Sequence, residues 1–274
     1  LKANDKKLDS LQQIIAKNKK DSNEVNALIE LSNFYRSTSY DTSFNFAKEA
    51  HTLAESISFQ KGLGYAFKAL GLVENQHGNY VDALRYWKEG LRVFEASNNK
   101  LGAANLLNNI GTIYYNKSDE TNALDFYLRS LKASEEIKDT LRIATALMNL
   151  GGVYSNKPST YAKALDYHRQ ALVLSKKIGD ITLIGGSNAN IGEIYLNQQK
   201  LDSAIYYLLQ AKTNYAGSMD LPYSLNVLGK IYRSKRNYKQ AIAYHQQAYD
   251  TALVYDTKLD IGQALLQIAE TYKD

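Results

Sequence analysis

Asparagine is the residue type whose spacing in this chain points to binding chemistry. Asn109, Asn149 and Asn190 each stand two residues before a glycine, inside the repeated string N-[IL]-G-x-[IV]-Y-x-N. A carboxamide both donates and accepts hydrogen bonds, so it can pair with the N–H and C=O of a peptide. Because asparagine is a mediocre helix former, three copies in register need a reason. We predict that these side chains hold an extended peptide by its backbone. Hydrogen bonding between repeats without a ligand remains the alternative.

Further polar residues share the helix face of these asparagines. Residues three and four apart lie on one face of a helix. The cations Lys230 and Arg233 are either solvated residues near a helix end or an anchor for an acidic side chain or C-terminal carboxylate. The predicted peptide-binding groove consists of Asn105, Asn108, Asn109, Thr112, Asn149, Asn190, Glu193, Asn226, Lys68, Lys230 and Arg233.

No residue pattern indicates catalysis or a cofactor. The string Gly185-Gly186-Ser187 lacks the lysine of a phosphate-binding loop, and the HExxH, GxSxG and GxGxxG motifs are absent. Cysteine is also absent, which excludes disulfides and cysteine-ligated metals. We therefore expect no enzymatic activity and no cofactor.

The histidines do not suggest a metal site. Three of them stand four residues after a recurring alanine, a place that an aromatic residue or a leucine fills in other repeats. A position that accepts such different residues indicates packing between helices, so we predict no metal. The residues at this position are His51, Trp87, Tyr127, His168, Leu208 and His245.

The elements that position these residues are paired helices. In residues 106–131, apolar residues recur at three and four, pause over a polar stretch at 116–120, and then resume. The small residue Gly111 recurs at spacings of 37 to 41 residues, which is the mark of an α-solenoid. Its counterparts are Ser32, Gly71, Gly151, Gly192, Gly229 and Ala269, and the small residues of the second helices are Ala47, Ala83, Ala123, Ala164, Ala204 and Ala241.

These residues resemble a known repeat family. The strings L-G-x-x-Y and Y-x-x-A, the latter seen at 80–83 and 238–241, are similar to the tetratricopeptide repeat. The period near 40 exceeds the usual 34 and resembles the long repeats of kinesin light chains and bacterial Rap-type regulators. The resemblance implies an all-α superhelix, a tetratricopeptide solenoid, of about six helix-turn-helix repeats plus a terminal helix. It also implies a module that binds proteins or peptides.

The repeat register sets the expected organisation. We expect an N-terminal capping helix within 1–24 and a repeat array over 25–274, with a longer turn at 37–43 inside the first repeat. Either a lone capping helix or a truncated longer array explains the last helix. The expected repeats are 25–60, 61–99, 100–138, 139–179, 180–216 and 219–256, followed by a terminal helix at 258–273.

The composition of the chain argues against nucleic acid and membrane as binding partners. The net charge of +5 is modest, and the basic residues form no stripe with stacking aromatics, so we expect no nucleic acid. No apolar run reaches the ~18 residues of a membrane span, so we expect no membrane contact by this segment. Because the chain starts at Leu1 without methionine, we expect an excised or processed fragment with further sequence after Asp274. A membrane anchor elsewhere in the parent protein is compatible with that expectation.

The N-terminal stretch followed by repeats resembles the sensor regions of Bacteroidetes-type signalling proteins. That resemblance implies the sensor or interaction region of a larger bacterial signalling protein, such as a histidine kinase, a cyclase or a transcriptional regulator. It favours a periplasmic location over a cytoplasmic one. The alternative function is a structural scaffold or oligomerisation domain without ligand sensing, and a homodimer stays open in either case.

Overall fold

The computed structural model describes residues 2–274, and in that range the chain is built from helices without a strand. The predicted all-α class is confirmed. The helices are α1 (Lys2–Ala16), α2 (Ser22–Tyr35), α3 (Tyr40–Ser56), α4 (Gln60–Gln76), α5 (Tyr80–Ala96), α6 (Lys100–Asn116), α7 (Glu120–Glu136), α8 (Thr140–Tyr154), the 3₁₀ turn η1 (Pro158–Thr160), α9 (Tyr161–Ile178), α10 (Ile181–Asn197), α11 (Leu201–Asn214), α12 (Leu221–Ser234), α13 (Tyr238–Val254) and α14 (Lys258–Lys273).

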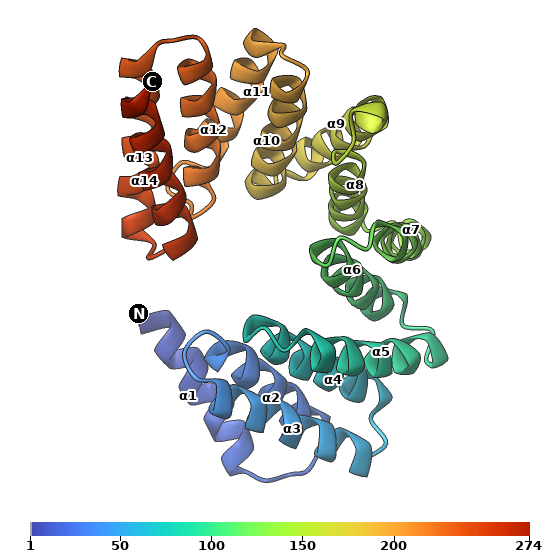
Figure 1. Ribbon diagram of the computed structural model, residues 1–274. Coiled ribbons are helices and arrows are strands. Elements are labelled where there is room, and N and C mark those ends of the chain that lie inside the picture. Colours follow the sequence, from blue (N-terminus) through green and yellow to red (C-terminus); the bar gives the residue numbers. More distant parts are fainter. Residues whose placement is uncertain (1) are drawn as a thin grey trace. The chain divides into compact units, whose positions relative to one another are not determined.

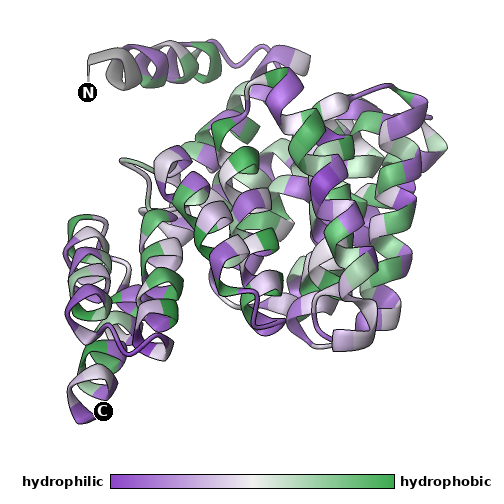
Figure 2. Cartoon of the chain, turned by 90° about the horizontal axis from the view of Figure 1, so that it is seen from above, coloured by the Kyte–Doolittle hydropathy of each residue, from purple (hydrophilic) through white to green (hydrophobic). Residues whose placement is uncertain are grey.

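The chain forms two compact units that meet in sequence between Arg142 and Ile143. The first unit contains α1 and the helix pairs α2/α3, α4/α5 and α6/α7, with α1 packed on α2 (Figure 1). The second unit contains most of α8 with α9, the pairs α10/α11 and α12/α13, and α14 packed on α13 and α12. Hydrophobic and hydrophilic residues alternate along the helices, as amphipathic packing requires (Figure 2).

Within each unit the first helices of successive pairs contact one another. Helix α2 contacts α4 and α4 contacts α6, and in the second unit α10 contacts α12 and α12 contacts α14. Among the described residues the second helices of successive pairs make no comparable contact. A layer whose first helices lie closer together curves with those helices inside. The residues predicted to bind therefore sit on the inner helices of their units.

In the five first helices that carry a glycine at the repeated position, the glycine makes room for a large side chain of the second helix. A Cβ on Gly111 would lie 2.7 Å from the ring of Tyr127, and one on Gly151 would lie 2.6 Å from the ring of His168. The two helices of a pair thus approach closely at the glycine, and the group that meets it is a side chain. The same pairing joins Gly71 to Trp87, Gly192 to Leu208 and Gly229 to His245.

In nearly every repeat an aromatic ring of the first helix stacks on an aromatic ring of the second helix. The tyrosine three residues after the small residue stacks on a ring of the second helix, as Tyr114 does on Phe126 with centroids 5.4 Å apart. In the second repeat Glu74 replaces the tyrosine and accepts hydrogen bonds from Tyr40 and Asn79 instead. The other pairs are Tyr35–Phe46, Tyr154–Tyr167, Tyr195–Tyr207 and Tyr232–Tyr244.

The first repeat departs from its predicted register. Helix α3 begins at Tyr40, so the expected long turn at 37–43 is wrong. Ser43 is the small residue that meets Ser32, whose carbonyl accepts from the Ser43 hydroxyl at 2.7 Å. Ala47 was therefore assigned one turn too late. Because of this shift, His51 does not occupy the position that packs against the small residue of the first helix, and its ring contacts Phe67 instead.

The turns use residues that suit their backbone conformation. Gly179 ends α9 with a left-handed φ of 70°, and the Asp180 carboxylate caps α10 by accepting from the Leu183 N–H. Pro158 begins η1, where its missing N–H costs no helical hydrogen bond. These turns set the order of first and second helices, and hence the inner surface of each unit.

Candidate binding surface on the inner helices

In the first unit the predicted residues lie on α4 and α6. Asn109 is half-buried, and it makes no hydrogen bond in the part of the chain that the structure describes. Asn108 also lies on this face, and its carbonyl accepts from the Thr112 hydroxyl at 3.1 Å. The Thr112 hydroxyl accepts in turn from Tyr127 at 3.1 Å, so this threonine already supports the packing of α6 on α7.

Lys68 forms the centre of a cationic cluster. Burial lowers the pKa of its ammonium group, and the nearby guanidinium groups of Arg142 and Arg36 lower it further. Among the described side chains of residues 6–274, this ammonium has neither a hydrogen bond nor an ion pair. Arg142 donates from Nε to the side-chain Oδ1 of Asn105 at 2.9 Å and pairs with Asp139 at 2.6 Å. Lys68 is therefore a half-buried positive charge without a compensating carboxylate.

In the second unit the asparagines have different surroundings. Asn190 on α10 is half-buried and has no hydrogen-bond partner among the described residues. Asn149 on α8 is half-buried too, but it does take part in an interaction. Glu193, one turn beyond Asn190, accepts a hydrogen bond from the Tyr223 hydroxyl. Of the two residues on α10, only Asn190 keeps its polar atoms available.

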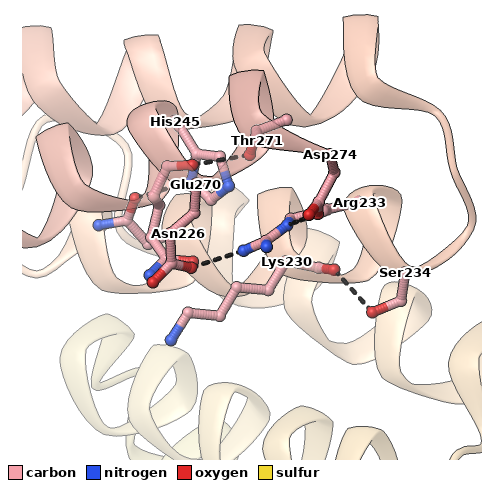
Figure 3. A network of polar contacts seen from close by, with 9 residues as sticks. Asn226, Lys230, Arg233, Ser234, His245, Glu270, Thr271 and Asp274 are labelled. Atoms are coloured by element: carbon pink, nitrogen blue, oxygen red, sulfur yellow. Dashed lines mark hydrogen bonds and ion pairs between the residues drawn. The ribbon is translucent and has the colours of Figure 1, made fainter.

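Asn226 belongs to a buried pair. The Nδ1–H of His245 donates to the Asn226 carbonyl oxygen at 3.0 Å, and Figure 3 shows this pair beside α14. The Asn226 amide nitrogen and the His245 Nε2 are buried without a partner in the described structure. Burial lowers the pKa of His245 to about 4, with smaller contributions from Lys230 and Arg233. The side-chain oxygen of Asn226 is therefore already bound by a core histidine.

Arg233 is already paired with carboxylates of α14. Its Nη1 lies 2.5 Å from Glu270 and its Nε 2.5 Å from Asp274, and both contacts appear in Figure 3. These hydrogen bonds raise the pKa of Arg233. Lys230 is exposed and forms no ion pair within the described range. An acidic ligand would thus meet Lys230 directly but would have to displace two carboxylates from Arg233.

The structure brings the predicted residues together in two groups. Lys68 and Asn105 meet around Arg142, while Asn226, Lys230 and Arg233 gather at α12 and α14. Sequence reasoning missed Arg142 because it stands at the start of α8, outside the register that located the other residues. The signal available was the sequence Asp139-Thr140-Leu141-Arg142, a helix cap followed three residues later by a cation.

Among the side chains that the structure describes, those of residues 6–274, no group of three histidine, aspartate or glutamate residues is arranged to hold a metal ion. None of the described helices combines the length and the apolar character needed to cross a bilayer.

Two parts of the chain match known sequence profiles. Residues 102–177 and residues 224–258 each match a tetratricopeptide repeat. No curated protein matches the chain.

Solved structures of similar fold exist. BtubC (BKLC) from P. vanneervenii is 16% identical, with a TM-score of 0.67 over 80% of this chain and 93% of that one. A Rap protein complexed with Competence and Sporulation Factor is 14% identical, with a TM-score of 0.67 over 97% and 84% of the two chains. NprR in complex with its cognate peptide NprX is 14% identical, with a TM-score of 0.66 over 91% and 72%. At these identities the likeness concerns the fold.

Proposed function

We propose, from the premise that this chain is a tetratricopeptide-repeat protein, that it is a non-catalytic module that binds an extended peptide on its inner helices. One observation carries the proposal: half-buried polar groups on these helices lack partners. They are Lys68 and Asn109 in the first unit and Asn190 in the second. Folded chains pair nearly all polar groups that they remove from water, so such groups are suited to a ligand that completes them.

Each group suits a different part of a peptide. The carboxamides of Asn109 and Asn190 can donate to a peptide C=O and accept from its N–H, whatever the peptide side chains. The charge of Lys68, reinforced by Arg142 and Arg36, favours a carboxylate. The module should therefore prefer an extended peptide with an acidic side chain or a free C-terminus near Lys68.

The wider role follows from the resemblances. Two solved structures of similar fold are complexes, a Rap protein with Competence and Sporulation Factor and NprR with its cognate peptide NprX. Together with the signalling-type sequence, they support a sensor or interaction region of a larger bacterial signalling protein. We place it in the periplasm, with the cytoplasm as the alternative. In this proposal the chain catalyses no reaction, and peptide binding to it changes the activity of other domains of the larger protein.

A scaffold role is the second candidate, and α14 supports it. This helix exposes four large apolar side chains, which suits association with another helix or with a second copy of the chain. In a scaffold the polar side chains of the inner helices would be hydrated and would bind no peptide. The exposed residues are Leu259, Leu265, Leu266 and Tyr272.

A displayed library of random peptides separates the two candidates. Peptides selected on the chain are synthesised and titrated calorimetrically against the chain and against Lys68→Glu. We expect acidic peptides to be enriched and Lys68→Glu to weaken them at least about tenfold. Lys61→Glu, an exposed change of equal charge on the same helix, serves as the control. Selection of no peptide, or equal affinity for both variants, contradicts the proposal.

A further inference from the structure

A pocket lies in the second unit, away from the residues of the peptide-binding proposal. It has a volume of about 320 Å³ and lies between α9, α10 and α11. Its lining includes Lys176, Asn188, Tyr206, Tyr207 and Gln210, and none of the residues around it is acidic. The two tyrosine rings meet edge to face with centroids 5.2 Å apart, which fixes one wall.

Asn188 is the residue that sets this pocket apart. It stands four residues before Gly192, where Leu107, Leu147 and Leu225 precede their own glycines and fill the core. Only 3% of Asn188 is exposed, and its carboxamide finds no hydrogen-bond partner in the described part of the chain. This carboxamide borders the pocket, where a ligand that enters can pair with its donor and acceptor groups.

The equivalent place in the third repeat is also a pocket, of about 350 Å³, but its charged side chains pair with one another. There Glu95 pairs with Arg129 at 3.2 Å, and Lys100 pairs with Glu136 at 2.6 Å. In the register of the repeats, Lys176 takes the place of Glu95 and Gln210 takes the place of Arg129.

The exchange changes the charge of the pocket. Lys176 forms no ion pair with the side chains described for residues 6–274, and it is exposed to solvent at the pocket. The ion pair of Glu95 and Arg129 is thus replaced by an unpaired cation, Lys176, beside the carboxamides of Asn188 and Gln210.

We infer that this pocket binds a carboxylate. The ammonium of Lys176 would pair with the charge, and the amide groups of Asn188 and Gln210 would donate to the carboxylate oxygens. The rings of Tyr206 and Tyr207 and the side chain of Ile184 would hold the apolar body of the ligand. A small organic acid and the C-terminus of a peptide share this chemistry. The site does not depend on the groove of the inner helices.

An NMR titration of the full chain with phenylacetate tests the inference. We expect saturable shifts in the amide signals of α9, α10 and α11 in the millimolar range, and none with neutral phenylacetamide. Lys176→Glu should weaken phenylacetate at least about tenfold, while Lys177→Glu, next to it and outside the lining, should not. A phenylalanine-ending tetrapeptide with a free or an amidated C-terminus distinguishes the two sources of the carboxylate.

Two substitutions of Asn188 complete the test. Asn188→Leu should abolish binding and raise the melting temperature, because leucine fills this position in other repeats. Asn188→Asp keeps the shape and should also abolish binding, by repelling the carboxylate. Binding that survives both variants overturns the inference, and so does equal binding of phenylacetamide or the absence of saturable shifts with all probes. Asn109→Ala and Asn190→Ala should leave phenylacetate binding unchanged, which separates this site from the groove.

Discussion

Acid should destabilise the fold through His168. This side chain is fully buried over Gly151, its Nδ1 has no partner in the described structure, and burial lowers its pKa from 6.5 to about 4. The unfolded chain therefore binds a proton near pH 6.5, whereas the folded chain resists protonation until about pH 4. The stability contributed by neutral His168 is complete above pH 6.5 and declines as the pH falls toward 4. The difference between the two pKa values corresponds to about 3 kcal/mol.

Urea denaturation at pH 7 and near pH 4.5 measures this loss. His168→Leu should remove its share of the pH dependence and keep the fold, because Leu208 fills the same place over Gly192. His245, whose pKa is also lowered to about 4, retains its own share and serves as the internal control. An unfolding free energy that falls equally with pH in the chain and in His168→Leu would refute the reasoning.

Three further perturbations follow from the packing. Gly151→Leu should place a side chain against the His168 ring and lower the unfolding free energy by about 1–3 kcal/mol, and an unchanged melting temperature would contradict the close contact. Lys68→Met should raise stability near pH 7, because the lowered pKa means that the fold disfavours the charged form; the gain should vanish as the pH approaches 10.5, and urea curves at both pH values check the sign. Ser43→Ala should lower the unfolding free energy by about 1 kcal/mol, because it removes the hydroxyl that donates to the Ser32 carbonyl. An unchanged unfolding free energy would favour Ala47 over Ser43 as the small residue of the first repeat.

The repeats could be predicted from the sequence because their packing is local and periodic. Each glycine faces a large residue on the next helix, and that residue follows the small alanine by four positions. The first repeat broke the rule because a serine took the place of the alanine. Ser43 is small and hydrogen-bonds to Ser32, so it packs as the alanines of the other repeats do. Because its side chain is polar, the sequence pattern placed it in a turn.

The candidate site was less predictable because long side chains reach across repeats. Arg142 extends from the start of α8 to Asn105 on α6, and Glu270 reaches Arg233 from α14. Sequence spacing identifies the face of a helix but not which polar groups the fold will satisfy internally. Asn190 stands two residues before Gly192 and Asn226 three before Gly229, and only Asn226 accepts a hydrogen bond from a core histidine.

The central claim is that the free asparagines of the inner helices bind a ligand and do not hold the repeats together. The direct test places a thermal melt beside a binding isotherm for the double variant Asn109→Ala, Asn190→Ala, with a peptide selected on the unchanged chain. The matched control is Asn116→Ala, Asn197→Ala, which removes exposed asparagines from the ends of the same two helices.

Alanine is the better helix former, so we predict equal or higher stability for the double variant. Each lost hydrogen bond contributes about 0.5–1.5 kcal/mol, so we predict affinity weakened by about tenfold or more, and an unaffected control. A double variant that melts earlier and binds the peptide as tightly as the unchanged chain would contradict the account.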